Sequence, residues 1–337
     1  MVLAMVILGG VTRLTGSGLS MVNWAPITGW LPPLSPEAWQ QVFALYQQTP
    51  EFRLINSTMD VAGFKGIFWL EYIHRLVGRL TGVVFLLPML YFAWCRQIDR
   101  PLFIRLVLLF LLGALQGGMG WYMVASGLVD QPHVSHYRLT AHLGMACLIY
   151  GYMLWLALDL WFAGETATSP PMAPCPKTLH LIHQMAFLIA VTSFVTLLAG
   201  GLVAGLKAGL AYNTFPLMGG RWIPEEYWLL SGIPAWLNLF DNVAAVQWNH
   251  RWLATLTVLL VMLLWVMSRR RPVTPRVNKA LHALLLMALV QFSLGIATLL
   301  SYVALPLASL HQTGALILLT IALFTVHQSG RTASTSL

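Results

Sequence analysis

The sequence predicts an all-α integral membrane protein with eight transmembrane helices, arranged as two parallel-repeat four-helix bundles related by a pseudo-two-fold axis along the membrane normal. Three observations support this fold class: a scarcity of charge, eight apolar runs and a similarity between the two halves. Of the 337 residues, 58% are hydrophobic and only 9% are Asp, Glu, Lys or Arg, against about 25% in a typical soluble domain. So few charges exclude a soluble enzyme and a disordered chain. The net charge of +8 does not indicate nucleic-acid binding, because the Lys and Arg residues form no patch with interleaved aromatic residues.

The apolar runs follow one another along the chain, and each approaches the ~20 residues that cross a bilayer. The first run is the weakest, because Arg13 and several glycines interrupt it, and we expect the natural N-terminus to be longer. The predicted spans lie at about 1–19, 67–94, 102–125, 139–162, 181–206, 248–267, 280–303 and 309–328.

Basic residues in the short loops predict which side of the membrane each loop faces. With the spans above, ten Lys and Arg residues and only three acids fall on one side, and five of these basic residues lie in the 268–279 loop. That side is therefore cytoplasmic, or the matrix side in a mitochondrion. The long loops at about 20–66 and 207–247 face outward, toward the periplasm if the membrane is a bacterial inner membrane.

The two halves of the chain match in pattern, which indicates a duplication. Four spans separate the equivalent stretches, so the repeats are parallel. We assign residues 1–165 to an N-terminal half and residues 166–337 to a C-terminal half. The aligned pairs are GGVTRLTGSGLS (9–20) with GGLVAGLKAGLA (200–211), EYIHR (71–75) with QWNHR (247–251), Gln116 with Gln291, and YRLTAHLG (137–144) with LASLHQTG (307–314).

Four of the ten histidines lie near the start of an even-numbered span, at similar depth in the outer leaflet: His74, His142, His250 and His311. Ionisable residues inside spans are rare and usually functional. One His on each of two facing helices can hold a haem iron from both sides, so the four predict two b-type haem sites, one in each half. The alternative is that they are polar core residues bonded to neighbouring helices. The remaining histidines lie in an outer loop or at the cytoplasmic ends of spans, where water can reach them.

Glu71 stands three residues before His74, so both lie on one face of the predicted helix. It would be ~4.5 Å further out along the helix axis, beside the edge of a macrocycle bound to His74. Its equivalent in the second half is Gln247, which has a similar size but no acid–base chemistry. The alternative for Glu71 is an ion pair with Arg75 or Lys65 at the outer end of the span.

Several arginines accompany the histidines, and an Arg beside a haem ligand can pair with a propionate. The alternative is that these side chains extend to the interface. We expect propionate contacts for Arg75 and Arg251, and weigh the two alternatives equally for Arg138. The candidate set is Arg75, Arg79, Arg138 and Arg251.

Eight stretches of the chain, in order and over nearly its whole length, resemble the haem A synthase family. The absence of cysteines in the outer loops is similar to the proteobacterial and mitochondrial branch, and the short N-terminus is a departure. The stretches are GGVTRLTGSGLSMVNW (9–24), PEF (50–52), FKGIFWLEYIHRLVGRL (64–80), GWYMVASGL (120–128), YRLTAHLG (137–144), AGLAYNTFPLMGGRWIPE (208–225), NHR (249–251) and LSYVALPLASLHQTG (300–314).

This resemblance implies an oxidoreductase that converts the C8 methyl of haem O to a formyl group, which gives haem A for terminal oxidases. Two oxidations give a gem-diol that loses water. Carried onto this chain, His74 and His142 bracket the substrate haem O, His250 and His311 ligate a haem b cofactor, and Glu71 matches the family's essential carboxylate. The bilayer, haem O synthase, oxidase assembly factors and a second copy of the chain are the candidate partners.

Two other classes of protein compete with this interpretation. A di-haem b-type electron-transfer cytochrome explains the paired histidines, but it does not explain Glu71 opposite Gln247. A transporter built from parallel repeats would need polar residues along a path across the bilayer, and the inner halves of the spans are nearly devoid of them.

Overall fold

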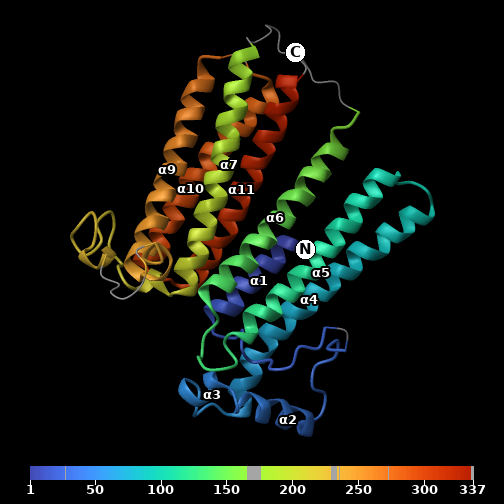
Figure 1. The fold of residues 1–337 in the computed structure, drawn as a ribbon, viewed down its shortest axis with the longest axis vertical. Coiled ribbons are helices and arrows are strands. Elements are labelled where there is room, and N and C mark those ends of the chain that lie inside the picture. Colours follow the sequence, from blue (N-terminus) through green and yellow to red (C-terminus); the bar gives the residue numbers. More distant parts are fainter. Residues whose placement is uncertain (27, 165–175, 229–233, 235, 272, 335–337) are drawn as a thin grey trace. The chain divides into compact units, whose positions relative to one another are not determined.

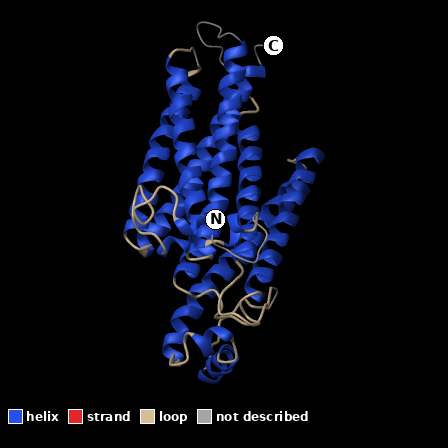
Figure 2. Cartoon of the chain, turned by 60° about the vertical axis from the view of Figure 1, so that its left-hand side comes forward, coloured by secondary structure: helices blue, strands red, loops and turns tan. Residues whose placement is uncertain are grey.

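The computed structural model describes residues 1–337 except 27, 165–175, 229–233, 235, 272 and 335–337. The described residues form helices joined by loops and contain no strand (Figure 2). In chain order the elements are α1 (Val2–Leu14), α2 (Pro36–Tyr46), α3 (Pro50–Leu54), α4 (Val61–Trp94), α5 (Arg100–Ala125), α6 (His136–Trp161), α7 (Pro176–Gly205), the 3₁₀ turns η1 (Ala208–Leu210) and η2 (Glu225–Trp228), α8 (Asn238–Asp241), α9 (Val243–Arg269), α10 (Pro275–Leu300) and α11 (Leu305–Ser334).

Seven of these helices are long and apolar enough to cross a membrane: α4, α5, α6, α7, α9, α10 and α11. They coincide with seven of the eight predicted spans. Many of their large apolar side chains are exposed, for example Leu87 and Leu111, as suits helix faces that contact lipid. The chain is therefore an all-α, multi-pass membrane protein.

The first predicted span, at about 1–19, differs from the helix found there. Helix α1 has 13 residues and ends at Leu14, so it rises only about 20 Å, less than the ~30 Å of a bilayer core. Gly16 has a φ of +65°, a left-handed conformation that glycine adopts at little cost. The chain therefore leaves the helix earlier than the apolar composition predicts.

Helix α4 has 34 residues and begins at Val61, six residues before the predicted span. The Asp60 side chain caps it by accepting from the Gly63 backbone N–H at 2.8 Å. The short helices α2 and α3 gather at this end of α4 (Figure 1). Buried aromatic side chains of α2 pack against those of the first turns of α4, and together they form one cluster: Trp39, Phe43, Tyr46, Phe64, Phe68 and Tyr72.

The chain divides into two compact units, Met1–Ile149 and Tyr150–Leu337. In the first unit, α1 packs on α4 and α4 packs on α5. In the second unit, α7 and α10 each pack on both α9 and α11, which closes a four-helix bundle. Apolar side chains fill its core: Ile182, Ile189, Val261, Leu264, Leu281 and Leu284. The boundary predicted at 165/166 lies outside the described residues.

Candidate functional site

Each of the four predicted ligand histidines packs against a glycine on another helix of its own unit. A methyl group in place of the glycine hydrogen would stand 2.9–3.1 Å from the imidazole Cε1 in all four cases. Glycine lets two helix backbones approach closely, and here it also leaves room for the ring between them. The pairs are Gly9 with His74, Gly120 with His142, Gly200 with His250, and Gly295 with His311.

The two histidines of the second unit lie side by side on α9 and α11. Their ring centroids are 6.3 Å apart and their planes are nearly perpendicular, at 87°. Because a metal–imidazole nitrogen bond is about 2 Å long, two rings on opposite sides of one iron have centroids roughly 6 Å apart. The separation of His250 and His311 fits a haem iron held between them.

Both rings make a contact at Nδ1, but only that of His250 is with a carbonyl, which can accept Nδ1–H and leave Nε2 for an iron. His250 Nδ1 lies 3.1 Å from the Thr196 carbonyl, one turn before Gly200. His311 Nδ1 lies 3.0 Å from the Gln291 amide nitrogen, one turn before Gly295.

In the first unit, the two histidines lie on different helices, His74 on α4 and His142 on α6. Their Nδ1 atoms are buried and have no hydrogen-bond partner among the described residues. Gln116 donates to the His142 backbone carbonyl at 2.9 Å, and Gln291 donates to the His311 carbonyl at 2.8 Å. Gln116 and Gln291 thus make the same kind of contact, each with the backbone carbonyl of a predicted ligand histidine.

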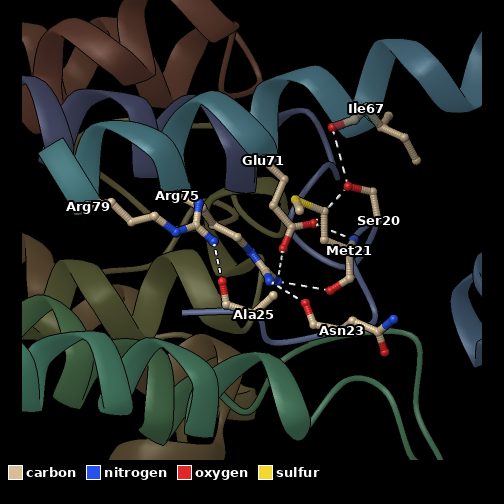
Figure 3. A network of polar contacts seen from close by, with 8 residues as sticks. All are labelled: Ser20, Met21, Asn23, Ala25, Ile67, Glu71, Arg75 and Arg79. Atoms are coloured by element: carbon tan, nitrogen blue, oxygen red, sulfur yellow. Dashed lines mark hydrogen bonds and ion pairs between the residues drawn. The ribbon is translucent and has the colours of Figure 1, made fainter. Parts of the chain in front are cut away.

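Glu71 is buried, with 2% of its surface exposed, and accepts three hydrogen bonds (Figure 3). Oε2 accepts from the Ser20 hydroxyl at 2.7 Å and from the Met21 backbone N–H at 2.8 Å. Oε1 accepts from Arg75 Nη2 at 2.5 Å. The ion pair with Arg75 therefore exists, but it is part of a buried cluster and not an isolated pair at the surface.

Gln247, the counterpart of Glu71, is equally buried at 2% exposed. Its amide nitrogen donates to the carbonyls of Ala208 and Tyr212, at 2.9 and 3.3 Å. Its amide oxygen accepts from Arg251 Nη2 at 3.2 Å. The groups that bond to Glu71 all donate hydrogen bonds, whereas two of the groups that bond to Gln247 are carbonyls that accept them.

Arg75 and Arg251 make matching contacts with the outer loops. Arg75 donates to the carbonyls of Met21 and Asn23, both at 2.9 Å. Arg251 donates to the carbonyls of Tyr212 and Thr214, both at 2.8 Å. These bonds fasten each loop to the helix that carries the histidine. They also occupy guanidinium N–H groups of Arg75 and Arg251, the two arginines for which the sequence predicted contacts with haem propionates.

The other two arginines of the candidate set also bond to backbone carbonyls. Arg79 donates to the Pro26 carbonyl at 3.2 Å. It also donates to the Ala25 carbonyl at 2.8 Å (Figure 3). Arg138 donates to the Tyr122 carbonyl at 2.8 Å and covers the Tyr122 ring. Among the arginines of the candidate set, two buried N–H groups lack a partner within the described chain: Arg79 Nη1 and Arg251 Nε.

Tyr212 and Glu226 form a polar pair in the outer loop, next to Arg251. The Tyr212 hydroxyl donates to Glu226 at 2.7 Å. Burial, with this carboxylate nearby, raises the pKa of Tyr212 to about 12. The same hydrogen bond lowers the pKa of Glu226. The pair stabilises the loop whose carbonyls hold Gln247 and Arg251.

One expectation about the remaining histidines is wrong. His327 is not solvated at a span end but is 4% exposed, because α11 continues to Ser334. Its Nε2 lies 2.9 Å from Asp159 Oδ1, and its ring packs on Trp155. Sequence reasoning also missed Ser20 and the four glycines. The repeat alignment could have indicated Gly9 and Gly200, which occupy matching positions.

Comparison with known proteins gives one consistent result. Residues 1–323 match the COX15-CtaA family, described as cytochrome oxidase assembly protein. The chain is 49% identical to a heme A synthase of Nitrosospira multiformis over 98% of this chain and 91% of the relative. It is 50% identical to a heme A synthase of Paramagnetospirillum magneticum, over 98% and 91%. The human heme A synthase COX15 is 44% identical over 97% of this chain and 79% of the relative.

Proposed function

The chain belongs to the cytochrome oxidase assembly protein family, and from that premise we propose that it is a haem A synthase. As such it is an enzyme that oxidises the C8 methyl of haem O to a formyl group and so supplies haem A to terminal oxidases. The relatives carry this name over nearly the full length of the chain. The observation that carries the proposal is the buried Glu71 three residues from His74, opposite a neutral Gln247 beside His250.

The two halves, residues 1–165 and 166–337, are repeats with one haem site each. Three contacts recur in both units: the glycine against each histidine, the glutamine on a histidine carbonyl, and the arginine on the outer loop. In this arrangement α1 corresponds to α7, although α1 is shorter. The repeats are parallel and related by an axis along the membrane normal.

His74 and His142 would hold the substrate haem O, and His250 and His311 would hold haem b. The paired imidazoles and the glycines that make room for them support a flat macrocycle between helices. Haem b, when bound, would supply one-electron redox chemistry. Arg79 and Arg251 are the favoured propionate partners, because each has a buried N–H without a partner among the described residues; Arg75 and Arg138 complete the set.

In the reaction, Glu71 takes a proton from the substrate methyl or from the attacking water, or stabilises positive charge that develops at that carbon. A carboxylate has about four acceptor positions, and three of them are filled, two on Oε2 and one on Oε1. The remaining position is on Oε1, which is therefore the atom that receives a proton. Arg75 holds this oxygen in place.

The charge distribution supports an orientation with the haem sites toward the periplasm, or toward the intermembrane space in a mitochondrion. The 268–279 loop, with five basic residues and no acid, then faces the cytoplasm or matrix. Haem O synthase and oxidase assembly factors would supply the substrate and receive the product.

Chromatography of the haems extracted from the purified protein tests the function. We expect haem b together with haem O or haem A when the cell supplies haem O. A di-haem electron-transfer cytochrome would contain haem b in both sites. A preparation that holds only haem b, even when haem O is supplied, would overturn the proposal.

A further inference from the structure

Residue 71 and residue 247 lie against equivalent loop segments that present opposite hydrogen-bonding groups. The alignment of 9–20 with 200–211 pairs Ser20 with Ala211 and continues to pair Met21 with Tyr212. Ser20 and Met21 offer Glu71 a hydroxyl and a backbone N–H. The second segment offers Gln247 two carbonyl oxygens and no hydroxyl, because Ala211 stands where Ser20 stands.

The donor-rich segment is suited to a carboxylate, and the acceptor-rich segment is suited to an amide. A carboxylate accepts hydrogen bonds at both oxygens, whereas an amide must also place its NH₂ group against acceptors. Ser20 is 2% exposed, and its hydroxyl lies 2.7 Å from Glu71 Oε2 but 3.4 Å from the Ile67 carbonyl. The hydroxyl is therefore committed to the carboxylate (Figure 3).

We propose that Ser20 is a positioning residue for the reaction, and that the pair of Ser20 and Glu71, not Glu71 alone, makes the N-terminal half the reactive one. This inference rests on the proposed role of Glu71. The Ser20 hydroxyl and the Met21 N–H hold Oε2, while Arg75 holds Oε1. With three donors the carboxylate has one orientation, and the remaining acceptor position of Oε1 is fixed in direction.

Removal of the hydroxyl leaves Oε2 with one donor. The carboxylate then rotates about its terminal bond toward Arg75, and Oε1 spends less time in the direction that accepts the proton. Substrate binding is not affected, because Ser20 contacts Glu71 and no predicted haem ligand. The expected signature is a lower kcat with an unchanged KM for haem O.

The experiment uses the full-length protein with bound haem b and measures haem A formed from added haem O. The informative variants are Ser20→Thr and Ser20→Val, which have the same shape and differ only in the hydroxyl. Because a hydrogen bond to a charged group is a strong one, we expect the Val variant to have a kcat roughly 10- to 100-fold below that of the Thr variant. Ser20→Ala should resemble Ser20→Val, with haem b content as in the unsubstituted protein.

Ser17→Ala is the matched control, since Ser17 is a buried serine of the same loop that bonds to Thr15 and not to Glu71. Its kcat should stay within about two-fold of that of the unsubstituted protein. Equal kcat values for the Thr and Val variants would overturn the proposal, as would a loss that appears only in KM.

A fourth variant, Glu71→Gln, separates this inference from the proposed function. If Glu71→Gln forms haem A normally, the role of the carboxylate in the proposed function is wrong. If Glu71→Gln is inactive while the Thr and Val variants are equal, only the role of Ser20 is wrong.

Discussion

The hydrogen-bonding groups around residue 71 favour a carboxylate over an amide. A glutamine there would lose the ion pair with Arg75, and its NH₂ group would face either the Met21 N–H or the Arg75 guanidinium, neither of which can accept a hydrogen bond. We therefore expect Glu71→Gln to lower haem A formation by about 100-fold or more, the usual contribution of a positioned acid or base. The ratio of haem A to haem O in membranes that supply haem O measures this effect.

The reverse exchange, Gln247→Glu, is the matched comparison for Glu71→Gln. It would set a carboxylate against the Ala208 and Tyr212 carbonyls and should destabilise the second unit without creating a second reactive site. Normal haem A output from Glu71→Gln would contradict the catalytic role.

Gly295 is a second residue whose replacement should have a specific effect. The methyl group of Gly295→Ala would stand 2.9 Å from His311 Cε1, with Nδ1 and Nε2 both at 3.5 Å, so the ring must shift. We expect the variant to lose most of its bound haem b, measured as absorbance per protein after purification.

Gly66→Ala is the control for this substitution, because Gly66 is also inside a helix but has open space around it. That variant should keep its haem and be stabilised by up to about 1 kcal/mol. Full haem content in Gly295→Ala would contradict the placement of His311 as a ligand.

At the scale of elements, the outer loop that carries Tyr212 should make stability depend on pH. The folded pKa of Glu226 is depressed, so its contribution to stability is present above the unfolded value of about 4.5 and is lost as pH falls below it. The folded pKa of Tyr212 is raised from 10.0 to about 12, so its contribution is present below pH 10 and lost as pH rises toward 12.

Tyr212→Phe removes the hydroxyl that joins the two groups. We expect a lower unfolding temperature than that of the unsubstituted protein at pH 7, and a difference that shrinks at pH 3.5 and at pH 12. A difference that stays constant over this range would mean that the pair does not link loop stability to pH.

The helices themselves were predictable from the sequence, but their ends and contacts were less so. Seven of the predicted apolar runs coincide with helices long enough to cross a membrane, because apolar composition and length are enough to identify such a helix. The end of α1 at Leu14 depends on the turn at Gly16, and the early start of α4 depends on aromatic packing against α2. Turn chemistry and tertiary packing therefore shifted these boundaries.

Some residues of the candidate site were likewise predictable from the sequence, whereas many of its contacts were not. The three-residue spacing from His74 singled out Glu71, because it depends on helix periodicity alone. The alignment of the two halves then paired Glu71 with Gln247. The contact of each glycine with its histidine joins two different helices, and the Ser20 hydroxyl bonds to Glu71 across 51 positions of the chain. Helix periodicity cannot predict contacts of either kind. The arginine contacts with loop carbonyls were missed because the paths of the two outer loops cannot be read from composition.

At the scale of the whole molecule, the residues of each proposed haem site lie within one unit, so the two proposed sites should be separable by mutation. Gly9, Gly120, His74 and His142 all lie in Met1–Ile149, whereas Gly200, Gly295, His250 and His311 all lie in Tyr150–Leu337. We expect His250→Ala to lose the haem b absorbance and to produce no haem A, because the cofactor is absent. We expect His74→Ala to keep the haem b absorbance while haem A falls to background, because only substrate binding is lost. Absorbance of the reduced protein and chromatography of its extracted haems measure the two effects on one sample. If His74→Ala and His250→Ala each removed half of the haem b, both sites would be permanent haem b sites, and the division into a substrate half and a cofactor half would be wrong.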